Sequence, residues 1–188
     1  GGEVVLHTRD DNLVRSRRDG DPGSAPFIVE AAGLPNLLHE LVHVWLRARG
    51  ADDARLRMDA NRVVHESAVV HEGVADFVAA ALTRDPVIGE ASLRITPTSL
   101  RVVATCPNDL TGASHHDALV VSGALWELAS LSPTALSHTL AAVRQSAVPG
   151  SASVAAFVDH MTKALAGTPL APPWSTLVDA RGLRHCAA

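Results

Sequence analysis

The sequence has no tyrosine, a single lysine (Lys163) and only two cysteines among its 188 residues. Without tyrosine, no phenol hydroxyl is available to assist a reaction. Because the fifteen arginines and the one lysine form no long basic run and aromatic residues make up only 3% of the chain, nucleic acid is not an expected partner. No uncharged stretch reaches the roughly 18 apolar residues that a membrane helix needs, so we predict a soluble protein with no membrane partner.

The start of the chain and its two cysteines bear on the compartment. The sequence begins Gly1-Gly2, with neither a Met nor a basic-then-apolar leader, so we expect that any targeting signal has been removed. Cys106 and Cys186 are consistent with one bridge that ties the C-terminus to a central loop, or with two buried thiols. Since an oxidising compartment permits the bridge, we predict a secreted or extracytoplasmic protein.

The length and the 47% hydrophobic content predict one domain, residues 1–188, with its own core. Short apolar runs predict two or three strands before residue 31, joined across the turn-rich segment 15–24. A helix is expected from Pro35 to Arg49, ended by Gly50.

The rest of the chain is expected to be mostly helical. Residues 51–60 predict a surface linker, and residues 84–112 predict loops with a short hairpin. Helices are expected at 61–82 (at least the second half), 117–131, 134–147, 152–166 (capped by Ser151) and 175–184 (after Pro172 and Pro173). The predicted fold class is therefore α+β: residues 1–50 give a small N-terminal sheet packed on the helix of residues 35–49, and residues 51–188 give a mostly helical lobe.

The first helix carries His39-Glu40-Leu41-Val42-His43, an HExxH sequence. Residues four apart lie on one helix face with Cβ atoms roughly 5–6 Å apart, so His39 and His43 can bind one metal ion. Glu40 lies one position further round, where it can reach a water on the open side of the metal and act as general base. The apolar residues around the motif predict a helix buried on most sides. A helix face that carries these three polar residues by chance is the alternative.

Two carboxylates on the second helix can complete this site. A catalytic zinc needs three protein ligands and an open position, and Glu72 can supply the third. Asp76 follows by one helical turn, so it can accept the free ring N–H of His39 and fix the tautomer of that histidine. A solvated polar face is the alternative reading of Glu72 and Asp76. His65 with Glu66 is a second pair, but it has no HExxH of its own, and we expect a surface or polar core role for it.

The combination of H-E-L-V-H with the downstream H-E-G-V-A-D-F resembles the gluzincin zinc metallopeptidases, the thermolysin-like and fungalysin-like enzymes, whose pattern is HExxH followed by ExxxD. The resemblance implies a compact zincin fold and a Zn2+ ion as cofactor. It also implies roles for five residues: His39, His43 and Glu72 as zinc ligands, Glu40 as general base and Asp76 as the carboxylate that supports the ligands.

A further segment is similar to the fungalysin-like proteins in particular. His115-His116-Asp117, followed by Gly123-Ala124-Leu125-Trp126-Glu127-Leu128, is similar to the H-x(n)-G-A-L-W-D-L segment that follows their metal helices. The resemblance implies that a histidine here stabilises the oxyanion. Counting back from Gly123 favours His115 over His116.

The chain also departs from that family. His71 stands where the family has Asn before the third ligand, so the substrate contact of that Asn is in doubt. Thermolysin-like enzymes use a Tyr for transition-state stabilisation, and here that help must come from His115, His116, His71 or an arginine. About thirty residues precede the HExxH helix, so the substrate-binding lobe is reduced or lies partly outside this chain. The metzincin spacing is ruled out, because Leu46 and Arg49 stand where those enzymes have Gly and a third His.

The expected function is that of a zinc-dependent peptidase, acting on a peptide or protein substrate. Two alternatives stay open at this point. One is a catalytically silent, zinc-stabilised module for peptide binding or interaction. The other is a latent peptidase whose own tail, which carries Cys186, closes the fourth position of the metal.

Overall fold

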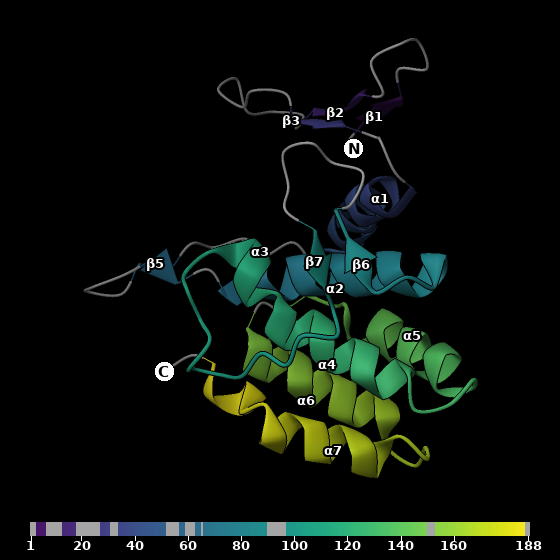
Figure 1. Ribbon diagram of the computed structural model, residues 1–188, viewed down its shortest axis with the longest axis vertical. Helices are drawn as coiled ribbons and strands as arrows, with labels where there is room; N and C mark the ends of the chain where they lie inside the picture. The colour runs from purple at the N-terminus through teal and green to yellow at the C-terminus, as the bar shows by residue number, and fades with distance from the viewer. Residues whose placement is uncertain are drawn as a thin grey trace.

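A computed structural model describes residues 34–51, 66–89, 97–149 and 153–186, and the backbone of five short strands closer to the N-terminus. Most described residues are helical, and the strands form small antiparallel sheets, in agreement with the predicted broad α+β class. Figure 1 shows the helices gathered together, with the last helix on the side away from the first. Buried hydrophobic residues from Val42 to Cys186 form one core cluster.

The N-terminal strands β1 (Glu3–Leu6), β2 (Leu13–Arg17) and β3 (Phe27–Glu30) form one antiparallel sheet in chain order. Val14 of β2 pairs with Leu6 on one side and Val29 on the other. The predicted strands are confirmed, but residues 15–17 belong to β2 and not to the predicted loop. Strand pairing uses backbone groups, so it tolerates charged residues there. The side chains of this sheet lie outside the described residues, and its packing on the HExxH helix stays a prediction.

Two shorter hairpins follow. β4 (Arg57–Met58) pairs with β5 (Val63–Val64), so the segment predicted as a linker contains a strand. The hairpin predicted within 84–112 is present as β6 (Val87–Ile88) paired with β7 (Thr98–Ser99). His65 and the β-rich piece 93–95 lie outside the described residues.

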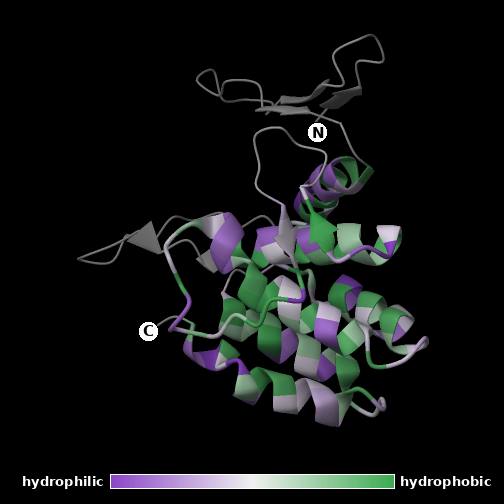
Figure 2. Ribbon diagram, in the orientation of Figure 1, coloured by the Kyte–Doolittle hydropathy of each residue, from purple (hydrophilic) through white to green (hydrophobic). Residues whose placement is uncertain are grey.

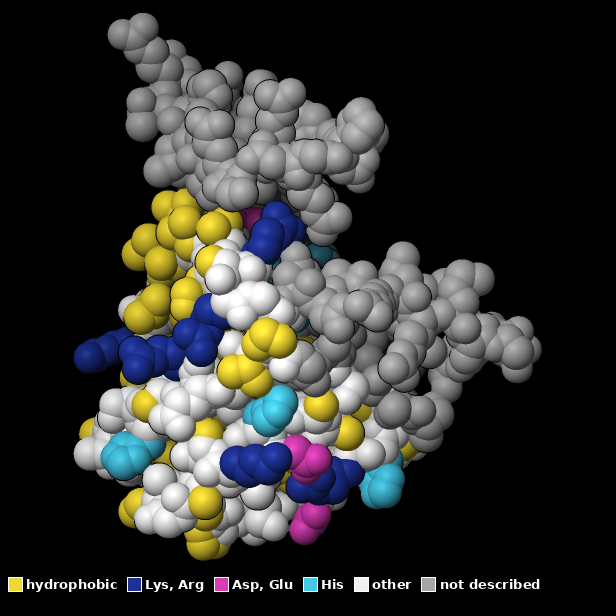
Figure 3. All heavy atoms as spheres, turned by 180° about the vertical axis from the view of Figure 1, so that it is seen from behind, with side chains coloured by type: hydrophobic (Ala, Val, Ile, Leu, Met, Phe, Trp, Pro, Cys, Tyr) yellow, Lys and Arg dark blue, Asp and Glu magenta, His cyan; other side chains and the backbone are white. Residues whose placement is uncertain are grey.

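Helix α1 (Leu34–Ala48) carries the HExxH sequence and ends, as predicted, before Gly50, whose φ of +69° is a left-handed conformation that glycine adopts without strain. The expectation of burial on most sides is wrong. Leu34 and Leu41 are exposed, and Figure 3 shows hydrophobic side chains gathered on the surface over α1. Its buried residues follow the spacing of a single helix face: Asn36, His39, Val42 and Leu46.

Helix α2 (Glu66–Thr83) is the central element, because it packs against both α1 and α4. It confirms the helix expected within 61–82. Apolar residues surround its axis, and Figure 2 shows hydrophobic residues along most of its neighbour α4 as well. Val74, Ala75, Phe77, Ala79 and Ala80 are all fully buried. A helix that is apolar on nearly every side is held by its neighbours, so its few polar side chains are fixed in position.

The single helix predicted at 117–131 is two helices, α3 (Ser114–Asp117) and α4 (Leu119–Ala129). The helical segment begins earlier than predicted because Asp117, which is buried, accepts hydrogen bonds from the preceding turn. Its carboxylate accepts from the Thr111 N–H at 2.7 Å and from the Gly112 N–H at 2.9 Å. This fixes the direction in which α3 starts.

Helices α5 (Ala135–Ser146) and α6 (Val154–Leu165) confirm the predicted pair. The cap of α6 is Ser153, whose hydroxyl accepts from the Ala156 N–H at 3.1 Å, whereas the predicted cap Ser151 lies outside the described residues. Helix α7 (Ala171–Ala180) begins earlier than the predicted 175–184 and contains Pro172 and Pro173. Proline is tolerated in a first helical turn, because the backbone N–H that it lacks has no partner there.

The C-terminal end returns to the middle of the chain. After α7, a short 3-10 helix, η1 (Leu183–His185), precedes a disulfide between Cys186 and Cys106. The bridge confirms one of the two expectations for these cysteines. Buried Arg181 adds a second tie, since its guanidinium donates to Glu127 at 2.8 Å. Because Cys186 is bonded to Cys106, its sulfur is not a free thiolate, so the tail cannot block a metal site through this sulfur.

Candidate metal centre

The two histidines of the HExxH sequence lie side by side on α1. Their Nε2 atoms are 3.0 Å apart, and their ring centroids are 4.7 Å apart at an interplanar angle of 75°. His39 is buried and His43 is partly buried. The spacing of four residues thus turns both rings to the same point, as the sequence predicts.

Helix α2 brings two carboxylates to that point. Glu72 Oε2 lies 3.0 Å from His39 Nε2 and 3.3 Å from His43 Nε2. Asp76 Oδ1 lies 2.8 Å from His39 Nδ1, which donates to it, since a carboxylate can only accept. The Nδ1–H of His39 is therefore occupied, and its Nε2 faces Glu72. The structure brings all four residues together in the arrangement that the two motifs predict.

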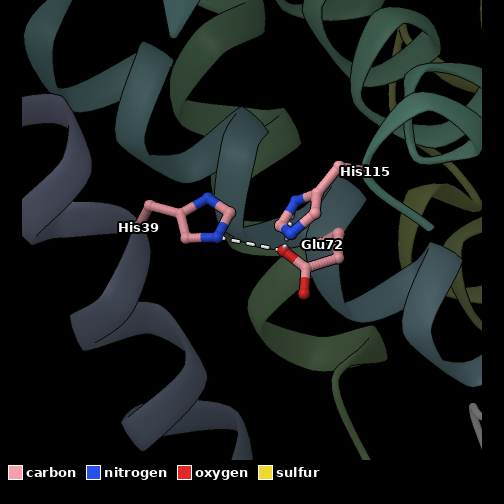
Figure 4. Close-up of side chains that lie close together, drawn as sticks. All are labelled: His39, Glu72 and His115. Atoms are coloured by element: carbon pink, nitrogen blue, oxygen red, sulfur yellow. Dashed lines mark ion pairs between the residues drawn. The ribbon is translucent and has the colours of Figure 1, made fainter. Parts of the chain in front are cut away.

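Helix α3 adds a third histidine. His115 Nδ1 lies 3.2 Å from Glu72 Oε2, and Figure 4 shows the ring of His115 beside this carboxylate, with His39 facing the same group from α1. The ring centroids of His39 and His115 are 6.3 Å apart. The side chain of His115 is 73% exposed, against 10% for His39.

This donor set fits a metal ion. Three ring nitrogens lie within 3.3 Å of Glu72 Oε2, yet this buried oxygen accepts no hydrogen bond of good geometry. Donors bound tetrahedrally at about 2.0–2.1 Å from an ion lie roughly 3.3 Å from one another. The separations among His39, His43 and Glu72, from 3.0 to 3.3 Å, match that spacing. His39, Glu72 and His115 likewise offer ligand atoms within 4.8 Å of one another, so the group can hold a metal ion.

The charges of the cluster favour a cation. Burial alone would lower the pKa of His39, but the carboxylates of Asp76 and Glu72 outweigh it and raise this pKa to about 10. Burial alone would raise the pKa of Glu72, but His39 and His43 hold it well below its usual range. Without a metal, the site therefore keeps a proton on His39 opposite an ionised Glu72. A divalent ion would replace that proton and satisfy both groups.

The remaining predicted residues are placed differently. Glu40 is partly buried on α1, and among the described residues none forms an ion pair or side-chain hydrogen bond with it. His71 turns to the end of α1, where Nε2 donates to the Ala51 carbonyl at 2.6 Å. His116 is half-exposed, and its Nδ1 lies 3.7 Å from Asp117. Of the three histidines considered for the oxyanion, only His115 has a ring nitrogen within 4 Å of Glu72.

Two residues that shape the site were not predicted. Asp117 accepts three hydrogen bonds from residues 111 and 112 and so fixes the turn that leads to His115. Gly73 allows close packing next to Glu72: a Cβ there would lie 2.7 Å from Val121 Cβ and 3.0 Å from the Ala118 carbonyl. For Asp117, the one sequence signal is the Thr111-Gly112 pair before a helix. For Gly73 there is none, because its role depends on a contact between distant segments.

No protein-family model matches this chain, and neither a curated protein nor a solved structure matches it. The likeness to the gluzincin peptidases therefore stays a prediction from the two motifs and the segment after them. Among the helices that the structure describes, none is long and apolar enough to cross a membrane. The function has to be argued from the cluster around Glu72.

Proposed function

We propose that the protein is a zinc-dependent peptidase that hydrolyses peptide bonds in a peptide or protein substrate. One observation carries the proposal: both histidines of an HExxH sequence lie within 3.3 Å of one carboxylate oxygen from a second helix. Two imidazoles and one carboxylate are a ligand set of catalytic zinc sites, which keep the fourth position open. Asp76 at 2.8 Å from His39 supplies the outer hydrogen bond that such ligands usually make.

In the proposed reaction, His39, His43 and Glu72 would hold the ion. When bound, zinc lowers the pKa of a coordinated water to about 7 and polarises a carbonyl oxygen. Glu40, next to His39 on α1, takes the proton of the attacking water and passes it to the leaving amine. His115 donates a hydrogen bond to the oxyanion, a role that the tyrosine-free sequence leaves to a histidine or an arginine. We expect the chain to work outside the cytoplasm, where the Cys106–Cys186 bridge is stable.

Glu40→Gln tests the role of the general base. The amide keeps the size of the side chain but cannot accept a proton, so we expect zinc content to stay at the wild-type level while hydrolysis of casein or a peptide library is lost. Asp179→Asn, the same acid-to-amide change at an exposed position of α7, is the matched control and should keep both. Full activity in Glu40→Gln would contradict the assigned mechanism.

A catalytically silent, zinc-stabilised binding module is the second candidate. It is favoured by the absence of tyrosine and by the lack, within the described residues, of a hydrogen-bonding partner that orients Glu40. This module would bind zinc through the same three ligands and unfold at lower temperature after chelation, but would cleave no member of a peptide library. Cleavage by the wild type that is lost in Glu40→Gln would exclude it.

A further inference from the structure

We infer that His115 is a fourth protein ligand of the metal in the substrate-free protein, so that the resting site is closed and opens when this ring leaves. The inference rests on the proposed metal site and adds its regulation. It assigns His115 two successive positions, first at the metal and then at the oxyanion. The evidence is the place of the ring, the way the backbone delivers it, and its exposure.

The position of the ring is the first argument. His115 Nδ1 lies 3.2 Å from Glu72 Oε2, the same oxygen that His39 and His43 approach at 3.0 and 3.3 Å. Three imidazole nitrogens thus converge on one buried oxygen that accepts no well-formed hydrogen bond. The distance from His115 to Glu72 matches the roughly 3.3 Å between ligands of a tetrahedral ion. An ion bound to this oxygen would therefore have the rings of His39, His43 and His115 next to it, and His115 belongs to the group of donors that can hold a metal ion.

The fold builds this approach into the backbone. The buried Asp117 carboxylate fixes residues 111 and 112, so the turn before α3 has a defined path. At Gly73 the start of α4 comes so close to α2 that a Cβ would meet the Ala118 carbonyl at 3.0 Å. Gly73 is next to Glu72 and Ala118 follows α3, so this contact sets the distance between the carboxylate and His115. The ring is brought to the cluster by the path of the main chain.

The ring itself is free to leave. The side chain of His115 is 73% exposed, and within the described part of the chain its one polar contact is Glu72. By contrast, His39 is 10% exposed and is tied through its other nitrogen to Asp76. A ligand without such an outer hydrogen bond is held weakly. Since a structural zinc site has four protein ligands and a catalytic one has three, release of His115 converts a closed site into an open one. The released ring would remain beside the site, within reach of an oxyanion.

Counting imidazole ligands tests this inference. Zinc-loaded full-length protein is examined by X-ray absorption spectroscopy, and zinc affinity is measured by competition with a chromophoric chelator. We expect three imidazoles in the wild type and two in His115→Ala, with zinc affinity at least about 10-fold lower in the variant. His116→Ala is the matched control, since this neighbouring ring is half-exposed and lies outside the cluster; it should keep three imidazoles and the wild-type affinity. Acetohydroxamate, which binds zinc through two oxygens, should remove one imidazole from the wild type only.

The outcomes separate the two claims. Two imidazoles in both the wild type and His115→Ala, with equal zinc affinities, would overturn the inference and leave the proposed peptidase site intact. A wild type that binds no zinc would overturn both. Circular dichroism of His115→Ala guards against misfolding, and His115→Gln gives a second variant that should also show two imidazoles.

Discussion

His39 and His115 lie at almost the same distance from Glu72 Oε2, 3.0 and 3.2 Å, but the fold holds them in different ways. His39 comes from the buried face of α1, and Asp76 fixes its ring. His115 comes from the short helix α3, whose backbone is fixed by Asp117 while the ring is open to solvent. The comparison teaches that one carboxylate can have a permanent partner and an exchangeable one. The difference depends on what holds the second nitrogen of each ring.

Removal of Glu72 should have the largest effect, because both histidines depend on it. In Glu72→Ala the cluster loses its third ligand and its negative charge, and we expect zinc affinity to fall by well over about 100-fold, beyond the loss typical of an outer hydrogen-bond partner. Metal analysis after dialysis measures this. The control Asp179→Asn, at an exposed position of α7, should keep a full complement of zinc. Unchanged stoichiometry in Glu72→Ala would contradict the assignment of the third ligand.

The raised pKa of His39 should make both protein stability and zinc affinity depend on pH. Its pKa is raised to about 10, so in metal-free protein it is protonated at neutral pH, and its contribution to stability is full below the unfolded value of 6.5 and lost as pH rises through about 10. Glu72 has a lowered pKa, so its contribution is full above the unfolded value of 4.5 and lost as pH falls. Because zinc must displace the His39 proton, we expect affinity to rise about 10-fold per pH unit between pH 7 and 9.

Thermal melts with zinc and with a chelator check this. The difference between the unfolding free energy with zinc and that with a chelator should grow by about 1.4 kcal/mol for each pH unit between pH 7 and 9. Calorimetry in two buffers of different ionisation enthalpy should show release of a proton on binding. A gap that stays constant with pH would contradict the protonated state of His39.

Loss of Asp76 should weaken zinc binding by His39, the permanent partner of Glu72. Asp76→Ala removes the acceptor at 2.8 Å from His39 Nδ1, and we expect zinc affinity to fall about 10- to 100-fold. Asp76→Asn retains an acceptor oxygen without the charge and should show a smaller loss. Chelator competition measures both variants. Equal affinities in Asp76→Ala and the wild type would show that His39 needs no fixed ring.

Loss of Asp117 should affect His115, the exchangeable partner of Glu72. Of these changes, we expect it to lower zinc affinity the least. Asp117→Ala leaves the Thr111 and Gly112 N–H groups without their acceptor, and we expect a loss of about 1–3 kcal/mol in unfolding free energy. Denaturant titration measures this loss. Zinc affinity should fall no further than in His115→Ala, since the other three ligands stay in place. A larger fall would mean that α3 supports α2 as well as His115.

Much of the cluster could be predicted because it depends on local spacing. Helical periodicity puts His39 beside His43 and Glu72 one turn before Asp76, and each pair lies on its predicted helix. The match to HExxH and ExxxD then indicated that the two helices meet. The prediction that α1 is buried on most sides was wrong, because the local sequence shows which residues are apolar but not which helix face has a neighbour.

The course of the chain around the site was harder to predict. The bridge between Cys106 and Cys186 was one of two expectations, since pairing depends on where distant segments meet. His71 was considered for the substrate, yet its ring donates to Ala51, the residue after the turn that ends α1. Such partners are set by the packing of α2 on α1.

The sequence by itself determined the helices, the ligand types and the two pairs of residues that face one point, because each of these follows from repeats of three or four residues along one helix. The family resemblance favoured His115 over His116, but only the tertiary structure decided that His115 lies beside Glu72, and that the ring of His39 is buried while the ring of His115 is exposed. Those facts depend on the contact of Gly73 with Ala118 and Val121, and a contact between segments so far apart in the chain has no local period.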